Sequence, residues 1–339
     1  MRAFSNANPK SIRDAVSLLS QAQQQGRSAS IVGGGSDLLG MVKEHLVEPD
    51  VLVNLKAIHG LDHIEEHHGG VRIGGLTTLD AISRDERIRK EYTVLAEAAD
   101  KVGTPQIRNA GTLAGNVSQR PWCWYFRNGF PCFKNGGKTC FSVAGENQFH
   151  AIFGGGPSYI VHPSDTAPAL VALDAKFHIA GPSGERVLPA SEFFQLPRVD
   201  ASRENVLAKD EILTAVELPA SRTGHRSTYN KVLDRESWTH AVVSVAMVLE
   251  LGSGVFASGP NERKIAICRS ARVVLGGVAP IPWRLPKVEA MLTGQRITPE
   301  LAAQAGEAAI EGAHPLAKNK YKLPLTKAVV KRTLLSLTA

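Results

Sequence analysis

The stretch Ile31-Val32-Gly33-Gly34-Gly35-Ser36-Asp37-Leu38-Leu39 decides the fold. The apolar run at 29–32 ends in three glycines, which is typical of a short buried strand that enters a tight turn. Glycines let the backbone approach a ligand closely, and the successive N–H groups of such a turn can form a nest for a diphosphate. No Gly-Lys-Ser/Thr and no Gly-x-Gly-x-x-Gly order is present, and no helix start clearly follows, so the stretch predicts neither a Walker A loop nor a Rossmann turn. Taken alone, it is also compatible with an ordinary tight turn.

A second glycine turn follows at 107–116, Ile-Arg-Asn-Ala-Gly-Thr-Leu-Ala-Gly-Asn. Gly111 and Gly115 flank the Thr112 hydroxyl, and Asn116 adds an amide. Two such turns can close on one diphosphate from both sides, with Thr112 and Asn116 supplying hydrogen bonds. We therefore treat the two turns as parts of one candidate binding site.

A third element, His-Pro-Ser-Asp-Thr-Ala-Pro-Ala-Leu at 162–170, holds a carboxylate between two prolines near a predicted strand end. The Asp165 carboxylate suits a ribose or ribityl hydroxyl. The alternative is that Asp165 caps a helix.

The pattern of strands grouped before helices predicts an α+β fold rather than a doubly wound sheet. Gly69 and Gly70 indicate a hairpin, Ser11 caps a first helix, and a break near 220–227 separates two domains. A turn at 181–184 joins two strands. The expected helices are 12–25, 79–89, 94–102, 287–292, 299–310 and 325–337, and the expected strands are 29–32, 51–55, 63–66, 71–73, 158–161, 175–179, 212–218, 229–233, 242–251 and 264–278.

Composition excludes several classes of protein. The 339 residues are 43% hydrophobic and 21% charged, as expected for a globular chain with real cores. The net charge of +7 is scattered, with no run of five basic residues, so we expect no nucleic-acid partner. The longest apolar stretch, 241–249, is too short for a membrane helix, and no secretory signal is visible at the N-terminus. We expect a cytoplasmic protein by default, with export to the periplasm on a signal-bearing partner as the alternative.

The middle of the chain, 104–156, is rich in glycine, asparagine and aromatic residues and is too long for an ordinary connection. It carries Cys123, Cys132 and Cys140, whose thiolates can supply three corners of an iron–sulfur cluster inside an aromatic shield. Three cysteines with one histidine can also bind zinc, although their spacing is unlike that of zinc-finger pairs. Cys268 lies far away in an apolar run and is expected to be a core thiol.

Four segments stand in the order and spacing of one family: VGGGSDLL at 32–39, QIRNAGTLAGNV at 106–117, HPSDTAPAL at 162–170 and YNKVLDRESWTHAVVSVA at 229–246. Together they resemble the FAD-binding medium subunits of the xanthine dehydrogenase and aldehyde oxidase family, also called molybdenum hydroxylases. The resemblance covers essentially the whole chain. It implies a vanillyl-alcohol-oxidase-type (PCMH-like) FAD-binding fold with a C-terminal three-stranded antiparallel sheet and helical domain.

The resemblance also implies the domain bounds. We expect an FAD-binding domain at 1–223, with a small lobe at about 1–57, a larger lobe at about 58–223 and a cysteine loop at 119–158. A C-terminal flavoprotein domain is expected at 224–339.

The resemblance assigns binding residues in the three motifs and one residue beyond them. The first turn wraps the FAD diphosphate, Asp165 faces the sugar-like hydroxyls, and Lys231 lies near the flavin ring, where its charge favours the reduced flavin. An ordinary solvated lysine is the alternative at 231. Non-covalent FAD is expected because the first turn contains no histidine. The expected FAD contacts are Val32, Gly33, Gly34, Gly35, Ser36, Asp37, Leu38, Leu39, Gly111, Thr112, Ala114, Gly115, Asn116, Asp165 and Lys231.

The cysteine loop resembles the segment that carries an extra 4Fe-4S cluster in aldehyde oxidoreductases and 4-hydroxybenzoyl-CoA reductase. The family's fourth cysteine is missing, which leaves His150, a ligand near Ser158 or solvent as the fourth ligand. Loss of the cluster, with the loop held by packing alone, is the alternative.

The implied function is electron transfer within a heterotrimer or a dimer of heterotrimers. A large partner subunit holds molybdopterin and oxidises aldehydes or related heterocycles, and a small partner subunit holds 2Fe-2S centres. Electrons then reach FAD in this chain and pass to an external acceptor. No catalytic acid or base is assigned to the chain. A self-sufficient flavin oxidoreductase and a cofactor-free scaffold subunit are the alternatives.

Overall fold

The computed structural model describes residues 1–221, 224–256 and 263–338, and the side chains of 253–256 and 263–266 lie outside the description. The predicted domain boundary at 223 falls on residues 222–223, which are outside the described ranges. No helix in the described part of the chain is long and apolar enough to cross a membrane.

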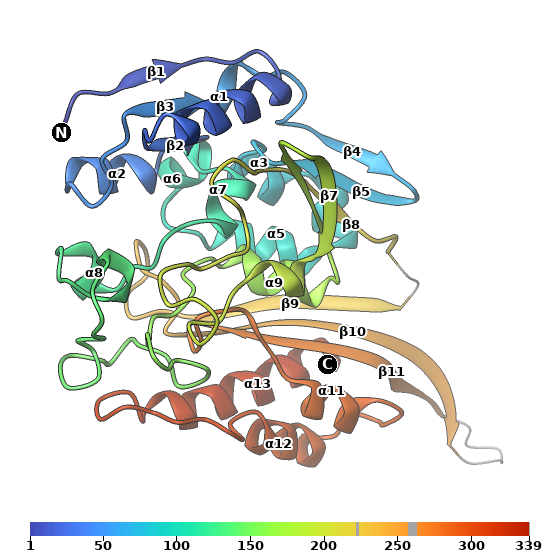
Figure 1. Ribbon diagram of the computed structural model, residues 1–339. Coiled ribbons are helices and arrows are strands. Elements are labelled where there is room, and N and C mark those ends of the chain that lie inside the picture. The colour runs from blue at the N-terminus through green and yellow to red at the C-terminus, as the bar shows by residue number, and fades with distance from the viewer. Residues whose placement is uncertain (222–223, 257–262, 339) are drawn as a thin grey trace.

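The small N-terminal lobe is a parallel sheet of β1 (Ser5–Ala7), β3 (Val51–Asn54) and β2 (Ala29–Val32), in that order. Helix α1 (Ile12–Gln24) begins where Ser11 accepts a hydrogen bond from the backbone of Asp14, and it buries Ala15, Val16 and Leu19. The lobe also contains α2 (Leu38–Lys43) and the 3-10 helix η1 (Leu55–Ala57). It forms the blue top of Figure 1.

The larger lobe contains a five-stranded antiparallel sheet in the order β4-β5-β8-β6-β7. Its strands are β4 (Ile64–His67), β5 (Gly70–Gly74), β8 (Ile212–Leu218), β6 (Lys176–Gly181) and β7 (Gly184–Pro189). Its helices are α3 (Leu79–Arg84), α4 (Glu86–Glu91), α5 (Thr93–Asp100), α6 (Pro105–Ala110), α7 (Leu113–Val117), α9 (Thr166–Ala172) and α10 (Ala190–Phe193). The loop between α7 and α9 carries α8 (Trp124–Arg127) and the 3-10 helix η2 (Phe133–Asn135).

The C-terminal part contains a second antiparallel sheet, β12-β11-β10-β9, and three helices. Its elements are β9 (His225–Val232), β10 (Val243–Phe256), β11 (Arg263–Gly276), β12 (Trp283–Arg284), α11 (Pro286–Leu292), α12 (Pro299–Ala308) and α13 (Lys322–Thr338).

Alternation along β10 explains why this sheet is buried on both faces. Val243, Val245 and Met247 pack into the core shared with α11–α13, whereas Ala246 and Val248 pack into the core shared with α5 and α9. Because successive strand residues point to opposite faces of the sheet, the side chains of this one strand contribute to two hydrophobic cores. The result is a layered molecule in which α5 and α9 lie above β9–β11 and α11–α13 lie below (Figure 1).

Several sequence-based expectations were wrong in detail. The helix expected at 79–89 divides at Asp85, whose side chain accepts a hydrogen bond from Ile88 N and starts α4. The strand expected at 158–161 does not form, because its backbone groups bond singly to loop segments: Tyr159 O accepts from Ala151 N, and Tyr159 N donates to Cys140 Sγ. The turn at 181–184 joins β6 to β7, an unpredicted, largely exposed edge strand.

A short helix does follow the first glycine turn, contrary to the sequence-based expectation. Helix α2 begins at Leu38, and Asp37 before it makes no side-chain capping bond. Its carboxylate instead accepts hydrogen bonds from Arg127 and from the backbone of Arg120. Asp37 is therefore a capping type of residue at the usual position, but its side chain bonds to the cysteine loop instead of to α2.

Candidate functional site

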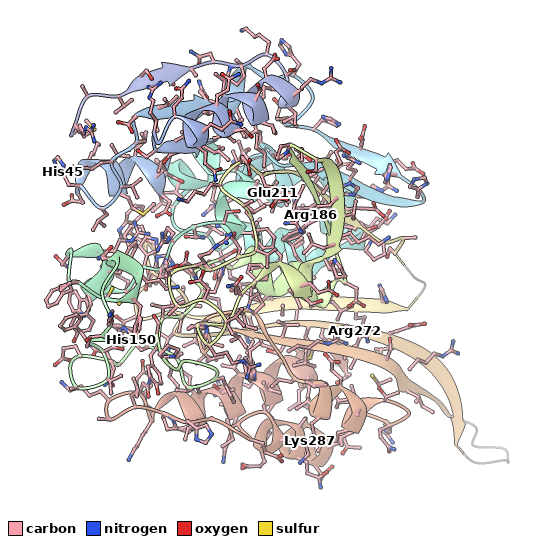
Figure 2. The ribbon with its side chains drawn as sticks, in the orientation of Figure 1. His45, His150, Arg186, Glu211, Arg272 and Lys287 are labelled. Carbon is pink, nitrogen blue, oxygen red and sulfur yellow. The ribbon has the colours of Figure 1, made fainter. Side chains whose placement is uncertain are left out.

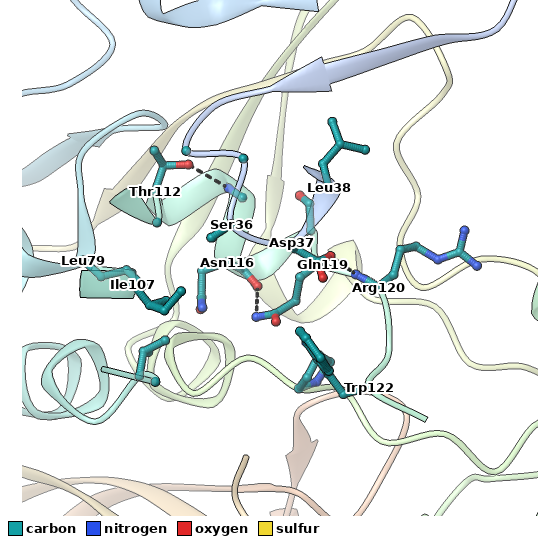
Figure 3. A pocket seen from close by; sticks show the side chains of 18 of the residues that line it. Ser36, Asp37, Leu38, Leu79, Ile107, Thr112, Asn116, Gln119, Arg120 and Trp122 are labelled. Carbon is teal, nitrogen blue, oxygen red and sulfur yellow. Dashed lines mark hydrogen bonds between the residues drawn. The ribbon is translucent and has the colours of Figure 1, made fainter. Parts of the chain in front are cut away.

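A cavity of about 500 Å³ lies where the small lobe meets the larger lobe, the cysteine loop and the C-terminal part. The two glycine turns form one wall, and Asp165 lies at its floor. Figure 3 shows this cavity with Ser36 and Asp37 of the first turn close to Thr112 and Asn116 of the second. Three of the sequence motifs, distant along the chain, therefore meet at one cavity.

The two glycine turns touch each other through backbone atoms. A Cβ atom on Gly34 would lie 1.8 Å from the carbonyl oxygen of Ala110, and one on Gly33 would lie 3.0 Å from Thr112 Oγ1. Gly35 has a φ of 78°, in the left-handed region that favours glycine. The glycines are therefore needed first for the close packing of the turns, which then shapes the cavity.

The first turn offers free backbone donors. Within the described residues, none of the backbone N–H groups from 34 to 38 donates a hydrogen bond to another protein group. Backbone N–H groups without partners are rare inside proteins unless water or a ligand satisfies them. Because consecutive donors line the cavity, they can bind the oxygens of an anion such as a diphosphate.

Thr112 and Asn116 are partly engaged within the protein. Thr112 Oγ1 accepts a hydrogen bond from Gly115 N at 3.3 Å and caps α7. Asn116 Oδ1 accepts from Ser164 Oγ at 2.5 Å and from Thr166 Oγ1 at 2.6 Å. The Thr112 oxygen thus stabilises the second turn itself, and the Asn116 oxygen fixes that turn to the start of α9, which leaves the Asn116 amide nitrogen as a donor at the cavity.

Asp165 borders the cavity but is buried, and both of its oxygens have protein partners. Tyr229 Oη donates to one at 2.6 Å, and Lys231 Nζ donates to the other at 2.7 Å. Burial and the neighbouring Asp165 carboxylate raise the pKa of Tyr229 well above its usual range. The helix-cap alternative for Asp165 is not realised, since its side chain makes no capping bond to α9.

Lys231 lies behind Asp165 rather than in the cavity wall. Its ammonium is 1% exposed and also donates to Lys101 O at 2.9 Å. The sequence-based reading placed this lysine beside the flavin ring, and the alternative reading made it a solvated lysine. In the structure Lys231 is buried and paired with Asp165. The Asp165 carboxylate therefore lies between the lysine charge and the cavity.

Twelve of the fifteen residues expected from sequence line the cavity. Leu39, Ala114 and Lys231 do not. Leu39 is 39% exposed, and Ala114 packs beside Gly75 of the larger lobe. The residues that line it are Val32, Gly33, Gly34, Gly35, Ser36, Asp37, Leu38, Gly111, Thr112, Gly115, Asn116 and Asp165.

Among the lining residues that sequence reasoning missed, two groups carry aromatic or charged side chains. The first comes from the start of the cysteine loop and includes Arg120 and Trp122. The second, with Arg235, Trp238 and His240, lies in the fourth family-like segment, where only Lys231 had been singled out. Tryptophans and arginines are visible in both sequence stretches, but no rule of residue spacing indicates that such side chains line a cavity.

The three loop cysteines are free thiols in one loop. Cys123 Sγ lies 3.4 Å from His150 Nε2, while Cys140 Sγ contacts Ser142 Oγ at 3.1 Å and accepts from Tyr159 N at 3.4 Å. Burial lowers the pKa of His150 to about 4, and its Nδ1 has no partner in the described residues. Across the described ranges, no three His, Cys, Asp or Glu side chains are arranged to hold a metal ion.

The C-terminal helix supports this loop from below. Lys322, fully buried, donates to the carbonyl oxygens of Phe149, His150 and Gly277, at 2.7–3.1 Å. Asn319 donates to the carbonyl oxygens of His150 and Ala151. Figure 2 shows His150 above the C-terminal helices. The backbone around His150 is therefore fixed, and within the described residues the ring atom Nδ1 is left without a partner.

Comparisons with known proteins agree in both halves of the chain. The family model described as "FAD binding domain in molybdopterin dehydrogenase" matches residues 2–221, and "CO dehydrogenase flavoprotein C-terminal domain" matches 228–337. The aldehyde oxidoreductase FAD-binding subunit PaoB of Escherichia coli (strain K12) is 35% identical over 92% of this chain and 91% of its own length.

Carbon monoxide dehydrogenase provides a second relative and a solved structure. Its medium chain from Hydrogenophaga pseudoflava is 27% identical, over 96% of this chain and 94% of that one. The structure of the enzyme from the same organism that lacks the Mo-pyranopterin moiety matches with a TM-score of 0.74 and 26% identity, covering 99% of this chain and 97% of that chain.

Proposed function

The chain belongs to the family of FAD-binding subunits of molybdenum hydroxylases, and on this premise we propose that it carries electrons in an aldehyde-oxidising complex. It is an FAD-containing oxidoreductase subunit with a PCMH-type fold, and molybdopterin and 2Fe-2S centres belong to other subunits. FAD, when bound, accepts electrons singly and passes on one or two of them.

The observation that carries the FAD assignment is the pair of glycine turns in contact at Gly34 and Ala110. They bring to the cavity a row of backbone donors that have no partner within the described residues. This arrangement fits a diphosphate. We propose that the first turn (32–38), Gly111, Thr112, Gly115 and Asn116 hold FAD, and that Asp165 with Lys231 sets the charge beneath it.

The aldehyde substrate rests on the relatives. The Escherichia coli relative at 35% identity is named an aldehyde oxidoreductase subunit, and the carbon monoxide dehydrogenase chain is less similar. We propose a small 2Fe-2S subunit and a large molybdopterin subunit as partners and an external electron acceptor. Aldehydes, or related heterocycles, would be oxidised on the large subunit. The cytoplasm is the proposed compartment, with periplasmic co-export as the alternative.

We also propose the domain division at 223/224 and a 4Fe-4S cluster on Cys123, Cys132 and Cys140. The extents of the two family matches, 2–221 and 228–337, support the division. The contact between Cys123 and His150 favours His150 over the Ser158 region as the fourth ligand. The protein would have to draw these side chains closer around the iron, since they are not assembled in the structure.

The first experiment is the visible absorption spectrum of the purified chain, before and after acid precipitation. Flavin bands that move to the supernatant are expected and establish non-covalent FAD. A colourless, folded chain that also fails to take up added FAD overturns the proposal and leaves the scaffold alternative. Turnover of a small electron donor by the chain without partners supports the self-sufficient oxidoreductase instead.

A further inference from the structure

Trp122 is an exposed aromatic residue at the cavity. Its side chain comes from the first residues of the cysteine loop, lines the cavity and is 48% exposed (Figure 3). A large apolar ring left half in solvent at the mouth of a binding cavity has surface available for a ligand. The loop that carries the cysteines is therefore also a wall of the candidate FAD site.

Arg127 holds this tryptophan in place. The guanidinium carbon of Arg127 lies 4.3 Å from the centre of the Trp122 ring, a cation–π contact. The same guanidinium donates to the carbonyl oxygens of Pro121 at 2.8 Å and Arg120 at 3.0 Å. One arginine thus supports the ring and the backbone on its N-terminal side.

Asp37 joins this loop to the first glycine turn. Its Oδ1 accepts from Arg127 at 2.7 Å, and its Oδ2 accepts from the backbone N–H of Arg120 at 3.1 Å. The Asp37 and Arg127 side chains are 19% and 13% exposed, so this ion pair is largely shielded from solvent. The carboxylate expected to contact the cofactor therefore anchors the cysteine loop at the cavity.

Trp122 lies near the Asp165 end of the cavity. Its ring centre is 5.3 Å from that of His240, whose Nδ1 donates to the carbonyl oxygen of Pro163 at 3.3 Å. Pro163 and Asp165 both line the cavity. The diphosphate nest at 34–38, Trp122 and the Asp165 motif thus line one cavity and can contact different parts of one dinucleotide.

We propose that Trp122 packs its indole ring against the isoalloxazine of bound FAD, positioned by the Arg127–Asp37 pair. The inference rests on the proposed function, because it requires FAD in this cavity. It gives the cysteine loop a role in cofactor binding that does not depend on whether the loop holds a metal.

Trp124 supplies a matched control. It lies two residues away in the same loop, is similarly exposed at 54%, and is not among the described residues that line the cavity. Arg186 is the matched control for Arg127. It also forms an ion pair, with Glu211 at 2.7 Å, but on the edge of the five-stranded sheet and not at the cavity.

The test measures FAD affinity and the fluorescence of bound FAD in full-length variants. An indole in contact with flavin quenches its fluorescence, because the excited flavin takes an electron from the indole and returns it. Trp122→Leu should increase bound-flavin fluorescence severalfold and weaken FAD binding by about three- to tenfold, the usual strength of an aromatic pair. Trp122→Phe should increase fluorescence but keep most of the affinity. Arg127→Met should shift both quantities in the direction of Trp122→Leu.

The controls decide the outcome. Trp124→Leu and Arg186→Met should leave both quantities at wild-type values. If wild type binds FAD and Trp122→Leu behaves like Trp124→Leu, the inference is wrong while the proposed function stands. If wild type takes up no FAD, both the inference and the proposed function are wrong. Thermal unfolding of each variant identifies misfolding, and Trp122→Phe then provides the fluorescence result with an aromatic ring retained.

Discussion

The carbonyl oxygen of Ala110 lies where a Cβ atom of residue 34 would be, at 1.8 Å from its ideal position. Gly34 and Ala110 belong to the two glycine turns, which lie 76 positions apart in the sequence yet meet backbone to backbone at the cavity. The contact between the two turns therefore requires that residue 34 has no side chain.

Gly34→Ala should separate the two turns. We expect a loss of about 1–3 kcal/mol of unfolding free energy, as for overpacked interiors, together with strongly weakened FAD binding. Gly40→Ala is the control, because a Cβ at Gly40 meets no atom within 4 Å and alanine favours its helix. Urea unfolding and equilibrium dialysis with FAD measure the two effects. Equal affinities for the two variants would show that FAD binding does not depend on this contact.

Lys231→Met should leave the buried Asp165 carboxylate without its cation. Removing one partner of a buried ion pair typically costs about 3–5 kcal/mol, so we expect a large fall in unfolding free energy. Adding Asp165→Asn should recover part of it. Lys287→Met, which breaks an exposed pair with Glu311, should cost at most about 1 kcal/mol. If the two lysine variants have equal unfolding free energies in urea, the buried Lys231–Asp165 pair stabilises the fold no more than the exposed Lys287–Glu311 pair does.

His162 should make the folded state sensitive to acid. Burial lowers the pKa of His162 to about 3 from an ordinary value of 6.5. Between these two pH values, His162 is protonated in the unfolded chain and neutral in the folded chain. The unfolding free energy therefore falls as pH decreases from 6.5 toward 3. Each pH unit costs at most about 1.4 kcal/mol.

The substitution His162→Asn removes this titration and offers an oxygen to Ser164 N, which now donates to His162 Nδ1. The stability of the variant relative to wild type should rise by about 1–2 kcal/mol between pH 7 and pH 5. The exposed His59→Asn controls for the loss of an imidazole. A relative stability that stays constant over this range would show that His162 does not carry the effect.

The cysteine loop can be tested by iron analysis. If it holds a 4Fe-4S cluster, chain purified without oxygen should contain about four iron atoms and as many acid-labile sulfides. Cys140→Ser and His150→Ala should lose iron. Cys268→Ser should retain it, because this thiol is buried in the core near α11 and burial raises its pKa to about 11. Iron-free wild type with a normal fold would favour a loop held by packing alone.

Local signals in the sequence determined part of the secondary structure. The capping by Ser11, the hairpin at Gly69–Gly70 and the glycine turn after β2 each depend on residues a few positions apart, and all three are present. The family-like segments identified the fold and FAD. Sequence reasoning missed α2 because six residues are too few to show a helical periodicity, and it missed β7 because that strand lacks an apolar alternation.

The tertiary structure alone decided which groups meet. Asp37 pairs with Arg127 across 90 positions, Asp165 with Lys231 across 66, and Trp122 lies beside His240. No periodicity encodes such contacts, because they arise when separately formed elements pack and each charged side chain must find a partner away from water. The sequence thus determined the cofactor class and the two glycine turns that we propose hold it, while packing decided that Lys231 lies behind Asp165 and that the cysteine loop lines the cavity.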